Sequence, residues 1–481
     1  MDNPVSHLST WIASLRKTPD ASCVELDSDL DLVKIFECFL QSPYPVYLDN
    51  VFQGVERRRF SYLSADPLLV LRSKGRLVEL ESRGIVHRLE ENPFLVLQGL
   101  LQYFKVPLLS DFPGFFGGAI GYFAYELAHH LERLPKVEKD DLLLPDMNLG
   151  FYDWVVVRDH QNKETHAFFL GLDNSEKAFT PKRLNKIVNE VVKRDICSTS
   201  ELVIQATHLK SNFSRCRYLA AVKKIKNYID RGDVYQVNLS QRFEALLNCH
   251  PWDLYLRLRQ LNPVSFSAYL EYPEVIIQSA SPEEFLGLDG DKVRTRPMKG
   301  TRPRGKSSAE DLKLLRELLH SEKERAENLM IVDLLRNDLG KVCIPGTVKV
   351  PELFAIEKYP TVLQMVSTVQ GRLQKGFDAV DILQACFPGG SVTGAPKIRA
   401  MKIISELEPS ARSIYCGALG YIGFDGSMMT SIPIRTLLVK KEKVFFQVGG
   451  AVVADSDPDA EFEETLHKAQ GSLDALGIYD R

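Results

Sequence analysis

Residues 415–439, YCGALGYIGFDGSMMTSIPIRTLLV, carry the clearest information about the fold. Two apolar runs, 415–424 and 430–439, flank Asp425-Gly426, a dipeptide that is typical of tight β-hairpin turns. The segment therefore predicts two strands that pair antiparallel. Pro433 falls inside the second run and has no backbone N–H to donate, which favours a sheet edge or a bulge at that point.

Outward from this hairpin, strand and helix patterns alternate. Residues 444–454 predict a further strand, and residues 460–476 predict a closing helix. Three more helices are predicted at 217–230 with Gly232 just past its end, at 308–339 with Ser307 or Ser308 as its cap, and at 396–407 with Pro396 in its first turn. Short links between neighbouring strands imply antiparallel pairing, which disfavours a simple Rossmann sheet.

The chain is long enough for two or three domain-sized units, with 481 residues of which 44% are hydrophobic. A polar segment at 173–200 predicts a boundary that separates residues 1–205 from residues 206–481. The net charge is only -3, because 60 Lys and Arg balance 63 Asp and Glu. A polyanion binder usually carries a basic excess, so nucleic acid is not an expected partner.

The cysteines and the lengths of the apolar runs indicate in which cellular compartment the protein is expected. The eight cysteines include no CxxC pair, so neither a zinc site nor a disulfide framework is predicted. No apolar run approaches the roughly 18 residues that span a bilayer, and residues 1–19 lack the layout of a signal peptide. We therefore expect a cytoplasmic protein without a membrane segment.

Charged side chains line one face of the closing helix. Glu461, Glu464 and Lys468 stand at i, i+3 and i+7, which places them on the same side. Such a stripe is either a solvated surface or a pair of oxygen ligands for Mg2+ beside a cation that binds an anionic substrate. Glu327, in the middle of another predicted helix, could add an oxygen ligand. Spacing alone leaves both interpretations open.

Two further features could carry chemistry. The glycine-rich segment 389–397 runs into a helix, so its amides suit a carboxylate or a phosphate, although a purely structural turn fits equally well. It lacks the Gly-Lys-Ser/Thr ending of a Walker loop. Lys299 lies in a strand-like segment between Met298 and Gly300. It is either a solvated charge or, if a pocket lowers its pKa, a nucleophilic amine.

Together these segments resemble the chorismate-utilising enzymes, a family that includes anthranilate, aminodeoxychorismate, isochorismate and salicylate synthases. The resemblance runs nearly the whole length of the chain. Its motifs are SASPE at 279–283, PMKGT at 297–301, ENLMIVDLLRNDL at 327–339, the glycine-rich loop and helix at 389–401, and the charged helix face at 461–468. The implied fold is α/β of the α+β type, with two face-to-face antiparallel sheets flanked by helices, as in anthranilate synthase component I. In that fold, residues 1–205 and 206–481 share the sheets.

Lys299 indicates the branch of the family. The aminodeoxychorismate branch carries a lysine at this motif position, whereas anthranilate synthases carry alanine. The resemblance therefore implies that the chain converts chorismate and ammonia to 4-amino-4-deoxychorismate for para-aminobenzoate and folate synthesis. It implies that Lys299 attacks C2 of chorismate, that Glu283 is the general acid/base for departure of the C4 hydroxyl, and that ammonia then adds at C4.

The resemblance also implies a metal and a set of substrate contacts. Glu327 and Glu464 match ligands of Mg2+, with Glu461 close by. The implied substrate-binding residues are Thr301, Ser391, Tyr415, Arg435, Gly449, Gly450 and Lys468. Arg435 would offer a two-pronged hydrogen-bond donor to a carboxylate. The chain contains no Gly-x-Cys-x-Gly nucleophile motif, so ammonia is expected from solution or from a separate glutamine amidotransferase subunit.

Three positions depart from the family pattern and leave alternatives open. Gln364 stands where the family usually has histidine, Met429 replaces an aspartate, and Ala451 replaces a glycine. Glutamine cannot donate a proton as imidazolium does. The alternatives are an anthranilate or isochorismate synthase, or a non-catalytic paralogue that binds chorismate or tryptophan. Relatives bind tryptophan in the N-terminal region, and residues 47–50 stand near the start of that pocket.

Overall fold

The computed structural model describes residues 21–51, 59–107, 114–173, 178–193, 204–360 and 362–479. Residues 1–20 and two parts of the predicted boundary segment 173–200, residues 174–177 and 194–200, therefore lie outside the described part of the chain, whereas Pro181–Lys193 between them form a helix. Within that part, no helix is both long enough and apolar enough to cross a membrane.

Twelve of the described strands form sheet A, with the order β1-β10-β9-β3-β2-β13-β14-β23-β24-β12-β11 and with β20 paired to β12. Their bounds are Ser22–Leu26 (β1), Val46–Asp49 (β2), Phe60–Ser64 (β3), Trp154–Asp159 (β9), Glu164–Phe169 (β10), Thr207–Ser211 (β11), Gln236–Leu246 (β12), Phe266–Glu271 (β13), Ile276–Ser281 (β14), Gly394–Ala395 (β20), Thr436–Lys440 (β23) and Lys443–Val452 (β24).

Twelve others form sheet B, with the order β17-β19-β16-β15-β22-β21-β7-β8-β4-β5-β6 and with β18 paired to β19. Their bounds are Leu69–Lys74 (β4), Leu77–Ser82 (β5), Ile85–Glu90 (β6), Gly118–Phe123 (β7), Met147–Tyr152 (β8), Glu284–Asp289 (β15), Lys292–Thr295 (β16), Met298–Pro303 (β17), Lys349–Lys358 (β18), Val362–Arg372 (β19), Ala418–Gly423 (β21) and Met428–Ser431 (β22).

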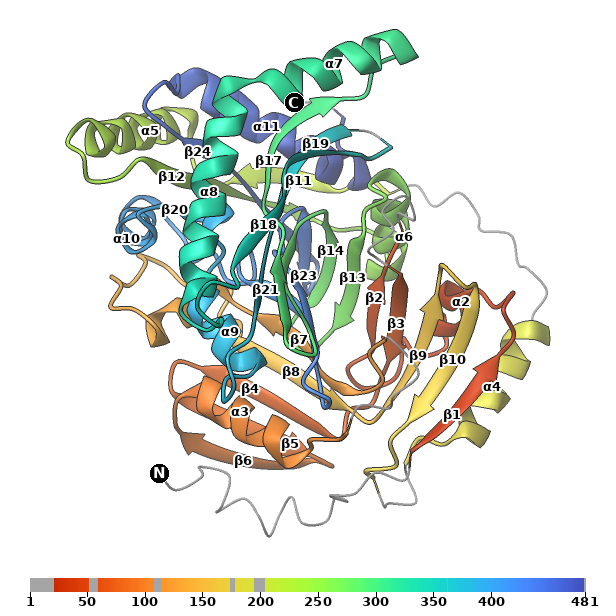
Figure 1. Ribbon diagram of the computed structural model, residues 1–481. Coiled ribbons are helices and arrows are strands. Elements are labelled where there is room, and N and C mark those ends of the chain that lie inside the picture. The colour runs from red at the N-terminus through yellow and green to blue at the C-terminus, as the bar shows by residue number, and fades with distance from the viewer. Residues whose placement is uncertain are drawn as a thin grey trace.

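The helices lie around the two sheets (Figure 1). Helices α5, α6, α10 and α11 contact strands of sheet A, and α7 and α8 contact strands of sheet B. The helix bounds are Leu32–Glu37 (α2), Pro93–Tyr103 (α3), Pro181–Lys193 (α4), Arg215–Asp230 (α5), Pro251–Leu261 (α6), Ser308–His320 (α7), Glu322–Gly340 (α8), Ala379–Cys386 (α9), Lys397–Leu407 (α10) and Pro458–Ala475 (α11), with short 3-10 turns at Tyr125–His130 (η2) and Gly390–Val392 (η3).

The sheets pack face to face over one shared apolar core, which confirms the predicted fold class. Buried residues of sheet A, such as Val46 and Ile277, belong to the same core cluster as Ile120 and Leu286 of sheet B. Strands within each sheet pair antiparallel. The hydrophobic alternation of these strands buries one face of each sheet against the other.

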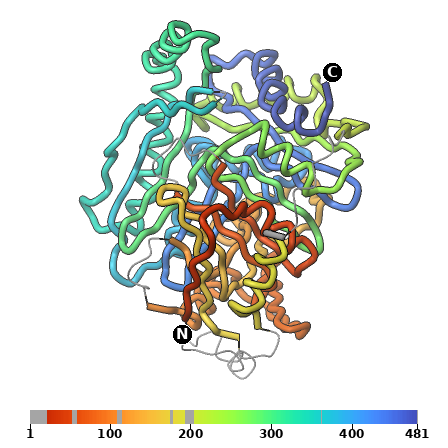
Figure 2. The backbone as a smooth tube through the Cα atoms, turned by 90° about the vertical axis from the view of Figure 1, so that its right-hand side faces the viewer, coloured from red at the N-terminus to blue at the C-terminus, as the bar shows by residue number. Residues whose placement is uncertain are grey.

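Both sheets contain strands from either side of residue 205. In sheet A, β2 pairs with β13; in sheet B, β7 pairs with β21. The segment up to β10 is red to yellow and fills the lower half of Figure 2, while the C-terminal helix lies at the top. The division into 1–205 and 206–481 stays a prediction, and the two parts are joined by continuous sheets.

The predicted hairpin is present, but the run after it was wrongly assigned to one strand. β21 and β22 pair across Gly426, whose φ of +91° suits glycine. Residues 430–439 then divide into β22, in sheet B, and β23, in sheet A. Pro433 lies in the link between the sheets, where no ladder hydrogen bond is needed.

The predicted helix at 308–339 is also two helices, because the chain breaks at Ser321. The backbone of Ser321 is extended, and its hydroxyl accepts a hydrogen bond from the N–H of Glu324, which caps α8. Figure 1 shows α7 and α8 meeting at an angle. The predicted helices at 217–230 and 460–476 are confirmed as α5 and α11, whereas α10 begins at Lys397 with Pro396 as its cap.

Two adjacent links carry the chain from one sheet to the other. Pro282 and Glu283 connect β14 to β15, and residues 432–435 connect β22 to β23. The links bond to each other: Ser281 Oγ donates to the carbonyl of Ile432 at 2.6 Å, and the N–H of Ile432 donates to the carbonyl of Glu283 at 3.1 Å. Glu283 and Arg435 are therefore held together where the sheets meet.

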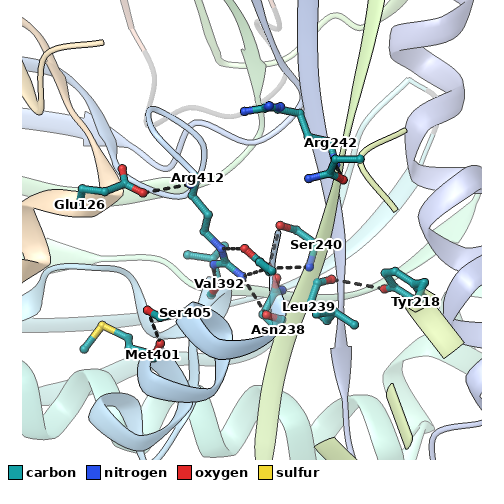
Figure 3. A network of polar contacts seen from close by, with 12 residues as sticks. Glu126, Tyr218, Asn238, Leu239, Ser240, Arg242, Val392, Met401, Ser405 and Arg412 are labelled. Carbon is teal, nitrogen blue, oxygen red and sulfur yellow. Dashed lines mark hydrogen bonds and ion pairs between the residues drawn. The ribbon is translucent and has the colours of Figure 1, made fainter. Parts of the chain in front are cut away.

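A buried ion pair fixes the segments beside these links (Figure 3). Arg412 donates to the carboxylate of Glu408 and, at 2.8 Å, to the carbonyls of Val392 and Asn238. Glu408 also accepts the N–H and the hydroxyl of Ser240. Both charged side chains are almost fully buried, so each depends on the other.

We expect Arg412→Met to lower the free energy of unfolding by roughly 3–5 kcal/mol, because it leaves the Glu408 carboxylate buried without its cation. Urea denaturation followed by fluorescence would measure the change. The matched control is Arg336→Met, which removes an exposed pair between Arg336 and Asp333 at 2.9 Å and should cost about 0.5 kcal/mol. Equal losses in the two variants would contradict a central role for the buried pair.

Candidate active site

A cavity of about 820 Å³ opens beside the two links, between β17, α8 and α11. Every predicted site residue except Gly450 lines it: Glu283, Lys299, Thr301, Glu327, Ser391, Tyr415, Arg435, Gly449, Glu461, Glu464 and Lys468. The structure thus brings together residues that are up to 185 positions apart in the sequence, from Glu283 to Lys468. Gly450 lies directly behind the wall, where a Cβ would come within 2.9 Å of Glu461 Oε2.

Lys299 reaches the cavity from β17. A bulge between Lys299 and Thr301, at Gly300 with a φ of +79°, shifts the register against β19. In the described part of the chain, the Lys299 amine forms no hydrogen bond or ion pair. Burial lowers its pKa and the charge of Lys468 lowers it further, while Glu327 and Glu283 oppose the shift. An amine with a depressed pKa is a better nucleophile near neutral pH.

Glu283 faces the same cavity from the first link. It is 4% exposed, and Ser391 Oγ donates to its Oε1 at 2.6 Å. Burial raises the pKa of Glu283 to about 7, although the Ser391 hydrogen bond and the charge of Lys299 act in the opposite direction. A carboxyl group that titrates near pH 7 can both give and take a proton, as a general acid/base must.

Three carboxylates gather at the other end of the cavity. Glu327 comes from α8, and Glu461 and Glu464 come from α11. Ser456 donates to Glu461 Oε1 at 2.6 Å, while Glu461 Oε2 is buried and has no hydrogen-bond partner among the described residues. Burial and the neighbouring charge of Glu464 raise the pKa of both Glu327 and Glu461. The negative charge of these carboxylates is partly offset by Lys323, which lies 4.0 Å from Glu327, and by Lys468, which pairs with Glu464.

The donor types fit magnesium. No three His, Cys, Asp or Glu side chains among the described residues are arranged closely enough to hold a metal ion by themselves. Mg2+, however, usually takes one or two carboxylates and completes its shell with water and substrate oxygens. The unpartnered oxygen of Glu461 and the adjacent carboxylates of Glu327 and Glu464 supply such ligands.

The anion-binding side of the cavity has unused positive charge. Arg435 lies in the second link with a φ of +51°, and burial lowers its pKa. Its guanidinium forms no hydrogen bond or ion pair with the described residues. Because a half-buried charge without a partner is costly, this arrangement favours an anionic ligand. Lys468 is half-exposed and bonds to Glu464 at 2.7 Å and to the carbonyl of Gly449 at 3.1 Å.

The remaining predicted contacts differ in position. Tyr415 and Ser391 are buried in the wall, whereas Thr301 is exposed at the rim. A Cβ on Gly449 would meet Leu239 O at 2.8 Å, so the backbone there has no room for a side chain. The start of α10 does not line the cavity. Of the glycine-rich segment that was predicted to bind an anion, only Ser391 and Val392 line the cavity. Both lie in the turn before α10.

Of the three departures from the family pattern, two face the cavity. Gln364 is 5% exposed and its Oε1 is buried without a partner, and Ala451 also lines the wall. Met429 does not line the cavity; its methyl group packs beside Gly287.

Sequence reasoning missed many residues of the wall, among them Asn238 and Lys323. Asn238 lines the cavity and its Oδ1 is buried without a partner. Lys323 lines it too, one turn before Glu327 on α8. The sequence shows the i,i+4 spacing of Lys323 and Glu327. An exposed lysine on a charged helix, however, does not by itself indicate a functional site.

Two cations of the cavity, Lys299 and Arg435, form no bond with the described residues, and burial raises the pKa of Glu283 to about 7, so the cavity is suited to chemistry on a small anion. The chain belongs to the chorismate-binding enzymes, because the sequence profile of that family matches residues 64–474. The predicted family membership is thereby confirmed, and the chain is a chorismate-utilising enzyme.

Relatives with two different names match most of the chain. Aminodeoxychorismate synthase component 1 of Escherichia coli (strain K12) is 39% identical over 435 residues, 90% of this chain and 93% of that protein. Anthranilate synthase component 1 of Thermus thermophilus is 40% identical over 442 residues, 91% of this chain and 93% of that protein. The crystal structure of anthranilate synthase component I from Streptococcus pneumoniae has a TM-score of 0.75 and 30% identity, covering 87% of this chain and 93% of that one.

We expect Glu283→Gln to stabilise the protein more at pH 8 than at pH 5. The pKa of Glu283 is about 7 in the folded chain and 4.5 as a free group. As pH rises from 4.5 to 7, the unfolded carboxyl ionises while the folded one stays protonated, so the wild type loses stability across this window. Glutamine cannot ionise and avoids that loss.

The difference between the two pH values should be about 2–3 kcal/mol, measured by urea denaturation. Glu463→Gln, on the exposed side of α11, is the control and should show no such pH dependence. A stabilisation that is the same at pH 5 and pH 8 would contradict the raised pKa.

Proposed function

We propose that this chain is the chorismate-binding subunit of an aminodeoxychorismate synthase, which converts chorismate and ammonia to 4-amino-4-deoxychorismate. The observation that carries the proposal is the amine of Lys299, which faces the cavity beside Glu283 and forms no bond of its own among the described residues. The names of the E. coli and Bacillus subtilis relatives, which are both 39% identical, support it.

The residues divide the reaction into two displacements. Lys299 Nζ bonds to C2 of the ring, the double bonds shift, and the C4 hydroxyl leaves as water with a proton from Glu283. Ammonia then bonds to C4, the double bonds shift back, and the C2–Nζ bond breaks. The excess proton on the new amine returns to Glu283, which restores the starting state. Two easier steps replace one difficult displacement.

The carboxylates of the substrate set its orientation. Arg435 would bind one carboxylate through two parallel hydrogen bonds, because its guanidinium is half-buried and forms no bond with the described residues. Lys468 and the backbone at Gly449 lie near the second. Mg2+ on Glu327 and Glu464, with Glu461 close by, would neutralise the ring carboxylate. Both reactive ring carbons would then lie between Lys299 and Glu283.

The proposed reaction also suggests where the ammonia comes from and in which compartment the protein works. A separate glutamine amidotransferase subunit would supply ammonia, as the name "component 1" of the relatives suggests. A cytoplasmic location fits a subunit that uses such a partner.

A tryptophan site near residues 47–50 also stays a proposal. In that segment Asp49 is buried and bonds to Arg259 at 2.5 Å.

Incubation of the purified chain with chorismate, Mg2+ and ammonium salts should yield 4-amino-4-deoxychorismate, identified by mass spectrometry. An added aminodeoxychorismate lyase should convert the product to para-aminobenzoate. Anthranilate together with pyruvate would reject the proposed branch. Isochorismate formed without ammonia would reject amination altogether. Binding of chorismate without turnover would favour the non-catalytic alternative.

Lys299→Ala should lower kcat for amination roughly a thousandfold, because it removes the nucleophile. The dissociation constant for chorismate, measured by calorimetry with Mg2+ present, should stay within about threefold, since Arg435 and the carboxylates remain. Lys292→Ala is the matched control, because Lys292 lies exposed in the neighbouring strand β16, outside the cavity. An unchanged amination rate in Lys299→Ala would rule out the covalent step.

A further inference from the structure

Lys323 stands at the lip of the cavity, next to the carboxylate end. It is the second residue of α8, one helical turn before Glu327. Its ammonium lies 4.0 Å from Glu327 Oε1, and its side chain is 61% exposed. The proposed reaction gives this lysine no role, although it lines the same cavity as the catalytic residues.

The charge of Lys323 reaches carboxylates from two helices. It lowers the pKa of Glu327 on its own helix, and of Glu461 and Glu464 on α11, against the burial that raises all three. Lys323 lies 4.0 Å from Glu327 and lines the same cavity as Glu461 and Glu464. Lys323 therefore occupies the side of the cluster that faces solvent.

The other two lysines of the cavity are less exposed than Lys323. Lys468 bonds to Glu464 at 2.7 Å and to the carbonyl of Gly449 at 3.1 Å. Lys299 points into the cavity from β17. Lys323 alone of these three combines high exposure with a distance from its carboxylate that is at the outer limit of an ion pair. Exposed lysine pairs of this kind contribute little, so Lys323 can leave at small cost.

We propose that Lys323 is a removable counter-cation: it balances Glu327, Glu461 and Glu464 while no metal is bound, and it withdraws into solvent when a divalent cation binds them. The inference rests on the metal site of the proposed function. Lys323 would act through its charge on the carboxylates and would not touch the substrate. It also means that Lys323 and the metal compete for the same negative charge.

The test is Lys323→Met, which keeps the length of the side chain and removes its charge. Titration of Mg2+ by calorimetry, without chorismate, should give a dissociation constant roughly threefold to tenfold lower than that of the wild type. The matched control is Lys313→Met on α7. Lys313 forms the same i,i+4 arrangement with Glu317 at 3.9 Å and is 75% exposed. Its removal should leave Mg2+ affinity unchanged.

Thermal unfolding supplies a second readout that does not depend on activity. In EDTA, Lys323→Met should melt below the wild type, because three adjacent carboxylates have lost a counter-charge. Saturating Mg2+ should abolish the difference, so the rise in Tm on adding Mg2+ should be larger for the variant. Lys313→Met should show the same rise as the wild type.

Equal or weaker Mg2+ binding by Lys323→Met would overturn the inference. Unchanged Mg2+ binding with weaker chorismate binding would mean instead that Lys323 attracts the substrate. Absence of Mg2+ binding in both wild type and variant would overturn the inference together with the metal site. The product assay described above judges the reaction separately, so failure of the counter-cation and failure of the proposed reaction can be told apart.

Discussion

The hydrogen bonds between the two inter-sheet links are the constraint on which the site depends. Ser281 and Ile432 tie one link to the other, and the links carry Glu283 and Arg435. Because each link is anchored in both sheets, neither residue can shift without moving paired strands. The Arg412–Glu408 pair extends this rigidity to β12 and to the turn that carries Ser391. Reactive groups are held in accurate positions by the rigid scaffold around them.

The rigid scaffold also fixes the environment that shifts the pKa values of the charged groups in the cavity. Burial raises the pKa of Glu283 and lowers that of Lys299, so the proton affinities of acid and amine move toward each other. In water such groups would form a simple ion pair. Here Glu283 bonds to Ser391, and Lys299 stays unbound among the described residues. Glu283, with a pKa of about 7, can transfer a proton near neutral pH, and the lowered pKa of Lys299 favours nucleophilic attack by its amine.

Patterns along the chain predicted much of this arrangement. The Asp425-Gly426 turn identified its hairpin, and helical spacing placed Glu461, Glu464 and Lys468 on one face of α11. The sequence could not predict that residues 430–439 change sheets, because strand periodicity does not say which sheet a strand joins. The break at Ser321 was missed because no glycine or proline marks it. The bond from Ser391 to Glu283 joins residues 108 positions apart, and no local pattern reports such a contact.

The pairing of β2 with β13 and of β7 with β21 has a consequence for how the chain can be divided. A cut near residue 205 would leave open ladders on both fragments, each with a row of unpaired backbone donors and acceptors. Exposed edges of that kind recruit other chains and aggregate. The N-terminal segment is thus not a removable cassette, and variation in it must preserve the pairing that the rest of the chain needs in order to fold.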